Sequence, residues 1–490
     1  MMDLSIFYGN LYAKDKPVFK IGFLIFAIAI VNYLGFKSDS SGAGTPTAFV
    51  VLEIALLALD PLYGFLFALT VHIDIMSCLV FNYIGPLSLL SMFYVFFING
   101  KLFTEILEDK KVKILVYISF ALGAYVALIN IGLISGFTKA NYVVNMGFIF
   151  GFLVILPAYY FTINRPRDFF TAIVVINVIF ILLFYMDVIK GTHLFKLDSS
   201  LHSQESTMER LAGYNVRQFA VFFFYLLPAV MLAPNLKTIP RYVFLFIGIF
   251  SFLVLVLAFY RLAMFYTIMG MLLSFWFIKK YADIKKLWKY LLLLIVFGVI
   301  VVLFFGKYIV EMKKIISITI DYFNGTGQDV SSDARFGTQK IFLTNLFYSS
   351  PFLGIGLVEM VKYYQFDLWG FVDFPFLGTL AAFGIIGMSL YYIKFYFMLS
   401  GTKRGLSHVD LSQEDPFLVY FYFALKAYLI SLITFRLIYV SWEFTYDYMQ
   451  AELGLFAGVF LALHRVLAAS PEEDTETEEN ENEEAAQIAL

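Results

Sequence analysis

The sequence predicts an all-α polytopic integral membrane protein of 12–14 transmembrane helices with one long extracytoplasmic loop. Three observations predict this class. The 490 residues are 61% hydrophobic and only 15% charged, whereas soluble domains carry about 25% charged residues. The apolar residues gather in runs close to the length of about 20 that crosses a bilayer. Lysine and arginine recur in alternate connections between these runs. Soluble enzymes, nucleic-acid modules and disulfide-rich secreted scaffolds are thereby excluded, and the single Cys78 excludes a disulfide framework.

Fourteen apolar runs are candidate spans. Asp60-Pro61 and Gly85-Pro86 either end a helix or kink a longer one, because proline removes a helical hydrogen bond. A single charge, at Tyr260-Arg261, separates the ninth run from the tenth, and the start of the run after Glu443 is weakly defined. Twelve to fourteen spans are therefore expected. No cleavable signal peptide is expected. The runs lie near 18–35, 47–59, 62–82, 84–99, 112–135, 142–163, 169–187, 216–233, 241–259, 262–278, 289–306, 374–398, 416–439 and 449–466.

The basic residues orient these spans, because lysine and arginine in short loops favour the cytoplasm. They occupy alternate connections throughout the chain, so an even number of spans with both termini in the cytoplasm is expected. The intervening short loops hold single charges such as Lys37 and Lys139. The residues assigned to the cytoplasm are Lys14, Lys16, Lys20, Lys101, Lys110, Lys111, Lys113, Arg165, Arg167, Lys237, Arg241, Lys279, Lys280, Lys285, Lys286, Lys289, Lys403 and Arg404.

Four regions follow from this topology. Residues 1–306 hold membrane helices one to eleven, and 307–373 form a long extracytoplasmic loop whose apolar content predicts packing on the membrane domain. Residues 374–466 hold the C-terminal membrane helices. Residues 467–490 are a disordered acidic cytoplasmic tail by composition. Nine of the 37 acidic residues lie in this tail, which has no lysine or arginine, so the rest of the chain carries 28 acidic and 35 basic residues.

Five arginines stand out because the predicted topology assigns them to the outer side, whereas arginine usually favours the cytoplasmic side. An arginine near hydrocarbon costs about 2.5 kcal/mol or more unless it meets a partner or water. Guanidinium binds phosphate oxygens in pairs. The group therefore predicts binding of an anionic lipid headgroup, above all a diphosphate. Its members are Arg210, Arg217, Arg261, Arg335 and Arg436.

Each arginine also has an ordinary structural explanation. Arg210 and Arg217 can pair with nearby glutamates or lipid phosphate, and Arg261 can snorkel to the boundary. Arg335 can pair with a neighbouring aspartate, and Arg436 with Glu443 or Asp447. The five histidines form no cluster, and no metal or cofactor is expected.

The order of features resembles the O-antigen ligase and O-antigen polymerase superfamily over roughly residues 205–400. Arg210-Leu-Ala-Gly213 is similar to the family's Arg-x-x-Gly, and Tyr260-Arg261 to its Ser-Arg helix entry, with tyrosine replacing serine. Arg335 followed by Pro351-Phe-Leu-Gly-Ile-Gly356 resembles its Arg and Pro-x-x-Gly-x-Gly sequence. The best match is Asp373-Phe-Pro-Phe-Leu-Gly-Thr-Leu-Ala-Ala-Phe-Gly-Ile-Ile-Gly387. Ligases usually carry histidine at the position of Asp373, so the acidic residue favours a polymerase.

The resemblance implies a glycosyltransferase C-like membrane enzyme that makes O-antigen, capsule or exopolysaccharide without a metal or cofactor. The donor and the acceptor would both be undecaprenyl-diphosphate-linked oligosaccharides on the periplasmic face of the bacterial inner membrane. Arg210, Arg217, Arg261 and Arg335 would hold the diphosphate, with Arg436 beside them. Asp373 is the candidate general base, although it could instead cap the helix at Pro375. Tyr363, Tyr364 and Trp369 could stack on sugars or pack on the bundle.

Two alternatives remain open. A ligase would transfer glycan to lipid-A core or another acceptor. A lipid-linked oligosaccharide flippase or transporter would also have 12–14 spans, but it would more often show two matching halves with interrupted helices. Membrane lipid is an expected partner in each case, a chain-length regulator or a separate flippase is an open one, and nucleic acid is excluded.

Overall fold

A computed structural model describes the protein over thirteen helical elements and the turns beside them. The regular structure in these residues is entirely helical, which confirms the all-α prediction for this part of the chain. The described residues are 17–37, 44–72, 104, 106–132, 151–190, 223–257, 261–282, 306, 310, 313, 317, 320–321, 350–354, 375–400, 402, 406, 414–438 and 447–468. The elements are α1 (Pro17–Lys37), α2 (Gly44–Leu59), α3 (Pro61–His72), α6 (Lys110–Gly132), η2 (Phe152–Val154), α8 (Ile155–Asn164), α9 (Pro166–Lys190), α11 (Leu227–Leu232), α12 (Thr238–Leu257), α13 (Arg261–Ile278), α17 (Pro375–Leu399), α19 (Pro416–Ile438) and α20 (Asp447–Ala468).

Each of the thirteen elements overlaps a predicted apolar run. The described residues 310, 313, 317, 320 and 321 are also helical, although the sequence predicted them to lie in the long loop. Two of the uncertain divisions are real breaks: α2 ends and α3 begins on either side of Asp60, and α13 begins at Arg261. The run near 84–99 falls outside the described residues, as does the run near 289–306 except for residue 306. Two helical stretches, Pro416–Thr434 and Ala451–Ala468, are long and apolar enough to cross a membrane.

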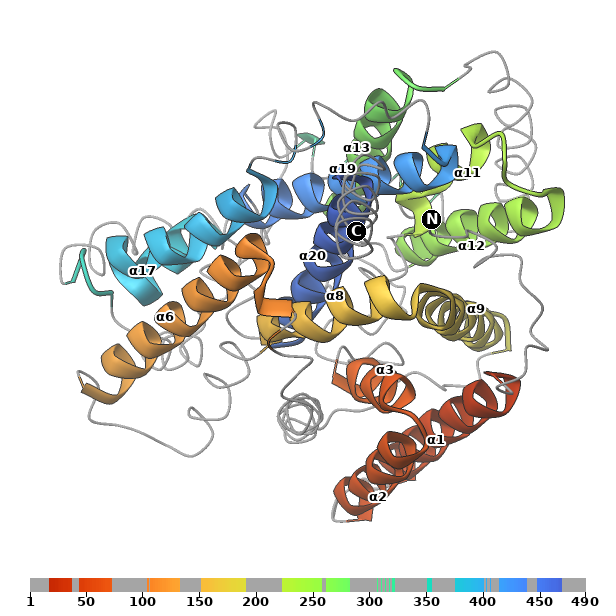
Figure 1. Ribbon diagram of the computed structural model, residues 1–490, viewed down its shortest axis with the longest axis horizontal. Helices are drawn as coiled ribbons and strands as arrows, with labels where there is room; N and C mark the ends of the chain where they lie inside the picture. The colour runs from red at the N-terminus through yellow and green to blue at the C-terminus, as the bar shows by residue number, and fades with distance from the viewer. Residues whose placement is uncertain are drawn as a thin grey trace, which may run out of the picture.

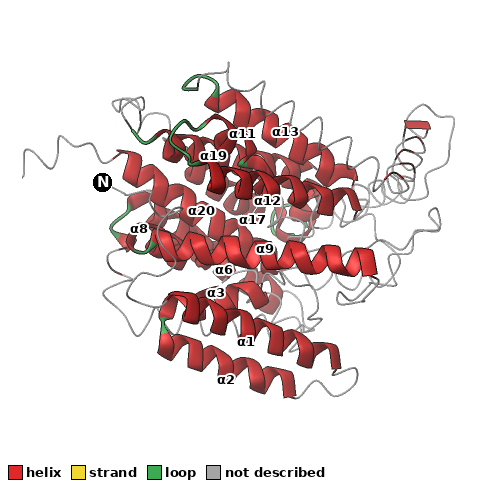
Figure 2. Cartoon of the chain, turned by 90° about the vertical axis from the view of Figure 1, so that its right-hand side faces the viewer, coloured by secondary structure: helices red, strands yellow, loops and turns green. Residues whose placement is uncertain are grey.

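The helices form a bundle in which α20 occupies the centre (Figure 1). It packs along α8 and against α19, while α6 lies beside α17 and α13 beside α19. Figure 2 shows α1 and α2 along one edge of the bundle, with α3 between them and the remaining helices. Elements far apart in the sequence are therefore neighbours in the bundle, as the pairs α6–α17, α13–α19 and α8–α20 show.

The contact between α20 and α8 depends on two glycines four residues apart. A Cβ at Gly454 would lie 2.6 Å from the carbonyl oxygen of Phe152, and one at Gly458 would lie 2.6 Å from that of Ile155. This Gly-x-x-x-Gly spacing puts both glycines on one helical face and lets two backbones touch, a common arrangement in membrane helix pairs. The backbone of α20 is therefore in direct contact with the backbones of η2 and α8 at the centre of the bundle.

Large apolar side chains also cover the outside of the described bundle. The most exposed include Leu128 on α6 and Tyr396 on α17, with exposed fractions of 72% and 68%. Others follow along α1, α2 and α13, and Trp276 is exposed while Lys279 lies 3.4 Å above its ring. Extended apolar surface of this kind marks contact with lipid or another protein. A tryptophan beside a lysine is typical of a membrane–water boundary.

Three aspartates cap the first turns of described helices. Asp109 accepts hydrogen bonds from two backbone N–H groups in the first turn of α6, at 2.9 and 3.2 Å. It also accepts one from the hydroxyl of Tyr159, at 2.8 Å, and Arg465 donates to that hydroxyl at 3.2 Å. Asp415 caps α19 in the same way and accepts from the Asn235 amide at 2.9 Å. These contacts join only connections and helix ends that the charge pattern assigns to the cytoplasm.

The third acidic cap, Asp60, is the centre of an ion network. It is 5% exposed and caps α3 through the Leu62 N–H, at 3.0 Å. Arg165 donates to both of its carboxylate oxygens, at 2.6 and 2.9 Å, and Lys20 donates at 2.8 Å. Arg165 also reaches Asp168 at 2.8 Å. The network ties α1 and the α2–α3 turn to the α8–α9 turn.

Candidate functional site

Two of the five singled-out arginines belong to described helices, and these helices are neighbours. Arg261 is the first residue of α13, and Arg436 lies two residues before the end of α19 at Ile438. The helices run antiparallel: the Tyr420 hydroxyl donates to the carbonyl of Tyr281 at 2.8 Å where α19 begins and α13 has just ended. The other ends of the pair therefore hold Arg261 and Arg436.

Tyr225, from the segment before α11, contacts both α13 and α19 near the middle of these helices. Its ring packs over Gly270 of α13, where an added Cβ would lie 1.9 Å from a ring carbon. Its hydroxyl is 3.0 Å from the hydroxyl of Ser431 on α19. Counting outward at about 1.5 Å per residue, nine residues lead from Gly270 to Arg261 and five from Ser431 to Arg436, so the two backbones differ in height along the helix pair by about 6 Å. The fold thus brings these two predicted residues to one end of a helix pair.

The other predicted site residues lie outside the described part of the chain. They are Arg210, Arg217, Arg335, Asp373, Tyr363, Tyr364 and Trp369. Their predicted roles stay predictions.

A break in α17 is the most unusual backbone feature in the described part of the chain. At Gly384 the backbone has φ 63° and ψ −172°, which interrupts the helix between Phe383 and Ile385. Residues with a side chain rarely adopt this conformation. A Cβ at Gly384 would also lie 2.2 Å from the carbonyl oxygen of Phe352. Glycine is therefore required twice here, by the backbone angle and by the approach of a second chain segment.

That second segment is residues 350–354, which lie within the predicted long loop. Pro351 and Phe352 offer their carbonyls to the backbone N–H groups of Ile385 and Ile386, at 3.0 and 3.3 Å. The first N–H groups of a helix have no partner within the helix. The loop segment therefore caps the second half of α17 with its own backbone. Its turn closes at Gly354, which has φ 77°.

Tyr125 of α6 ties these parts together. Its hydroxyl donates to the carbonyl of Phe383 at 2.8 Å, the carbonyl freed by the break, and lies 3.1 Å from that of Leu353. Gly387 makes room for the ring, since a Cβ there would lie 2.4 Å from a Tyr125 ring carbon. Tyr125 was missed at the sequence level, because a tyrosine inside an apolar run gives no local signal of a contact more than 200 residues away.

This junction joins parts of two of the segments whose resemblance to the polysaccharide-assembly family was noted from the sequence. Pro351-Phe-Leu-Gly354 comes from one motif and Gly384-Ile-Ile-Gly387 from the other. The chain between them leaves the junction at Gly354 and returns at Pro375, nine residues or about 13.5 Å of helix before Gly384. Asp373, Tyr363, Tyr364 and Trp369 lie between these two positions in the sequence and outside the described residues.

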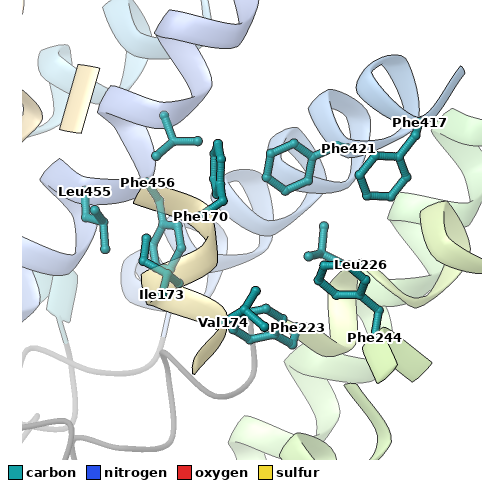
Figure 3. A pocket seen from close by; sticks show the side chains of 11 residues that line it. Phe170, Ile173, Val174, Phe223, Leu226, Phe244, Phe417, Phe421, Leu455 and Phe456 are labelled. Atoms are coloured by element: carbon teal, nitrogen blue, oxygen red, sulfur yellow. The ribbon is translucent and has the colours of Figure 1, made fainter. Parts of the chain in front are cut away.

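A pocket elsewhere in the bundle contains only apolar side chains (Figure 3). It lies among α9, α12, α19, α20 and the segment at α11. With no polar group at its wall, it offers nothing to recognise a sugar or a phosphate. It is lined by Phe170, Ile173, Val174, Phe223, Leu226, Phe244, Phe417, Phe421, Leu455, Phe456 and Val459.

Among the described residues, no three His, Cys, Asp or Glu side chains gather in a way that could hold a metal ion. In comparisons with known proteins, no family model matches the chain and no curated protein matches it. The positions of Arg261 and Arg436 and the α17 junction are therefore the structural basis for assigning a function.

Proposed function

We propose that this chain is an integral membrane glycosyltransferase that polymerises a surface polysaccharide, O-antigen or capsule/exopolysaccharide. It would take glycan from an undecaprenyl-diphosphate donor and join it to a sugar hydroxyl of a second lipid-linked repeat unit. The observation that carries this proposal is the backbone contact between residues 350–354 and the broken helix α17 at Gly384. Through this contact, residues from two separately noted motifs bind each other by backbone hydrogen bonds.

The membrane part of the proposal is a bundle of 12–14 helices in the bacterial inner membrane, with both termini in the cytoplasm. Three features support it. The outside of the described bundle carries many exposed apolar side chains. Short apolar helices accompany the two longer candidate spans. The polar contacts of Asp60, Asp109 and Asp415 join connections and helix ends that the basic residues assign to a single side.

The proposed reaction uses arginines in place of a metal. Arg261, Arg335, Arg210 and Arg217, with Arg436 beside them, hold the donor diphosphate and stabilise the negative charge that develops as it leaves. The acceptor hydroxyl attacks the anomeric carbon, a new carbon–oxygen bond forms, and the bond to the diphosphate breaks. The hydroxyl proton passes to Asp373, and undecaprenyl diphosphate departs. Tyr363, Tyr364 and Trp369 face the sugars.

The direct test supplies purified protein in lipid with lipid-diphosphate-linked repeat units and resolves the products by chain length. We expect a ladder of longer glycans that remain on the same lipid. Transfer to added lipid-A core without a ladder would identify a ligase. Unchanged units that move across the bilayer would identify a flippase. One observation favours this last candidate, since broken helices are common in transporters, although α17 has no broken counterpart among the described helices.

A further inference from the structure

A buried ammonium group lies at the end of the bundle that the charge pattern assigns to the cytoplasm. Lys111 belongs to the first turn of α6, and its Nζ is shielded from solvent and makes no hydrogen bond within the part of the chain that the structure describes. Burial lowers the pKa of this group, and the Asp109 carboxylate offsets only part of that effect. A buried charge is costly unless it is paired and hydrogen-bonded. Three N–H donors of Lys111 are therefore available to an anion.

Asp109, the carboxylate that acts on Lys111, is engaged by other groups. Its Oδ1 accepts hydrogen bonds from the backbone N–H groups of Lys111 and Val112, and its Oδ2 accepts one from the Tyr159 hydroxyl at 2.8 Å. Arg465 donates to the same hydroxyl and also feels the Asp109 charge. Asp109 thus serves a helix cap, a tyrosine and an arginine, and it does not hold the Lys111 ammonium.

A second lysine and a histidine belong to the same end of the bundle. His464 of α20 is 8% exposed, and the charges of Lys111 and Lys426 both act on its ring. Lys426 of α19 donates to the Thr402 hydroxyl, just beyond the end of α17, at 3.2 Å. The Tyr422 hydroxyl lies 3.5 Å from Nδ1 of His464 and also hydrogen-bonds to Thr402. These contacts connect α6, α17, α19 and α20 in one place. We refer to Lys111, Lys426 and His464 as the basic cluster.

This end of the bundle holds more positive than negative charge. Among the described residues, the charged groups that act on His464 or Arg465 are Lys111, Lys426, Asp109 and Glu108. With Arg465 itself they make three cations and two carboxylates, so one positive charge remains while His464 is neutral. Glu108 and Arg465 are exposed, and exposed ion pairs contribute little. The surplus charge therefore lies with the two lysines of the basic cluster.

We propose that the basic cluster binds a phosphate group. Two ammonium groups and an imidazole offer charged donors to phosphate oxygens, and a phosphodiester carries the single negative charge that would balance the surplus. Basic pockets between membrane helices on the cytoplasmic side bind anionic lipid headgroups in this way. A lipid headgroup and free phosphate share this chemistry. The site is separate from the proposed diphosphate site, because α19 carries Lys426 in its first half and Arg436 near its other end.

Binding is tested by thermal unfolding of the full-length protein in phosphatidylcholine nanodiscs, which carry no net charge. One arm adds phosphatidylglycerol to the bilayer, and the other adds inorganic phosphate to the buffer. A ligand that binds the folded state raises the melting temperature, so we expect a rise for wild type. A rise with phosphatidylglycerol alone would identify a lipid headgroup as the source, and a rise with inorganic phosphate would show that free phosphate suffices.

Lys111→Met is the decisive variant, because it removes the ammonium and keeps an unbranched side chain. Without anion it should melt at least as high as wild type, since a buried charge without a hydrogen bond is removed. We expect its affinity for the anion to fall at least about tenfold, as for the loss of one charged hydrogen bond. Lys113→Met is the matched control: Lys113 is an exposed lysine of the same helix, and its loss should change affinity by less than about twofold.

Lys426→Met is a second variant that decides the question if Lys111→Met does not fold, and the same loss of affinity is expected. No rise for wild type in either arm would overturn the proposal. Rises of equal size in wild type and in the folded lysine variants of the basic cluster would also overturn it, as would an equal loss in Lys113→Met. The proposal does not depend on the reaction proposed above, which the chain-length assay tests separately.

Discussion

Gly384 is the residue on which the α17 junction depends. Gly384→Ala places a Cβ at φ 63° and ψ −172°, a conformation used essentially by glycine alone that costs other residues about 1–3 kcal/mol, and drives it against the Phe352 carbonyl. We expect a loss of at least about 2 kcal/mol, or displacement of residues 350–354, with loss of glycan transfer. Unfolding in detergent and the chain-length assay measure the two effects.

The matched control is Gly22→Ala in α1, where nothing lies within 4 Å of the added Cβ. Alanine stabilises a helix interior by about 0.5–1 kcal/mol relative to glycine. Equal effects of the two substitutions would contradict the role assigned to the break.

Two further predictions at the scale of single residues concern Arg335 and Asp373. Arg335→Lys keeps the charge but cannot bind two phosphate oxygens as a planar fork, so we expect turnover to fall at least about tenfold. Normal turnover at wild-type expression would remove the bidentate role.

For Asp373→Asn, the proton acceptor is lost, and we expect a drop in kcat of about 10²-fold or more. Rates measured from pH 5 to 9 check this. Turnover equal to wild type at every pH would exclude Asp373 as the base.

At the scale of elements, the Asp60 network is sensitive to acid. Burial alone would raise the pKa of the Asp60 carboxyl, but hydrogen bonds from Arg165, Lys20 and the Leu62 N–H outweigh it and hold the pKa below its ordinary value. A lowered pKa means that the network contributes stability above the ordinary carboxyl pKa, about 3.9, and loses it as pH falls through the folded-state pKa.

We therefore expect Asp60→Asn to lose roughly 2–3 kcal/mol at pH 7, between the values for exposed and fully buried pairs. The difference from wild type should shrink below about pH 4. Denaturation midpoints over pH 3–8 measure this. Asp168→Asn, at a more exposed partner of Arg165, should change stability by less than about 1 kcal/mol. A difference that grows on acidification would contradict the assignment.

The packing of α20 on α8 makes a separate prediction. Gly458→Val inserts a branched side chain where a single Cβ already lies 2.6 Å from the Ile155 carbonyl. We expect the two helices to separate locally, with loss of about 2 kcal/mol or more. Cross-linking between cysteines introduced on α8 and α20, in a Cys78→Ser background, reports their distance. Unchanged cross-linking and stability would show that backbone contact is not required there.

At the scale of the whole molecule, the sequence predicted the helices well because their apolar runs are local features. The breaks at Asp60 and Arg261 were visible as a proline and a charge. The junction could be predicted only in part. Its glycines were noted in two motifs, whereas the roles of Tyr125 and of the capping carbonyls depend on contacts between distant parts of the sequence. Glu452 of α20 was missed for the same reason, since its burial, with an exposed fraction of 1%, depends on how distant helices pack.

The proposed orientation of the bundle is tested by single cysteines in a Cys78→Ser background. Ser41→Cys and Lys139→Cys lie in predicted outer loops, and Glu108→Cys and Glu414→Cys in predicted cytoplasmic ones. A thiol reagent that cannot cross membranes should label only the first two in intact cells. Labelling of all four, or the reverse pattern, would contradict the topology.

The central claim is that glycan is transferred from a lipid diphosphate at the outer face. The most direct measurement uses proteoliposomes in which the protein has one known orientation and lipid-linked repeat units are supplied to one leaflet only. The account predicts a ladder of lengthened glycans when the units are in the extracytoplasmic leaflet, and none when they are in the cytoplasmic leaflet. A ladder from the cytoplasmic leaflet, or no ladder from either, would contradict it.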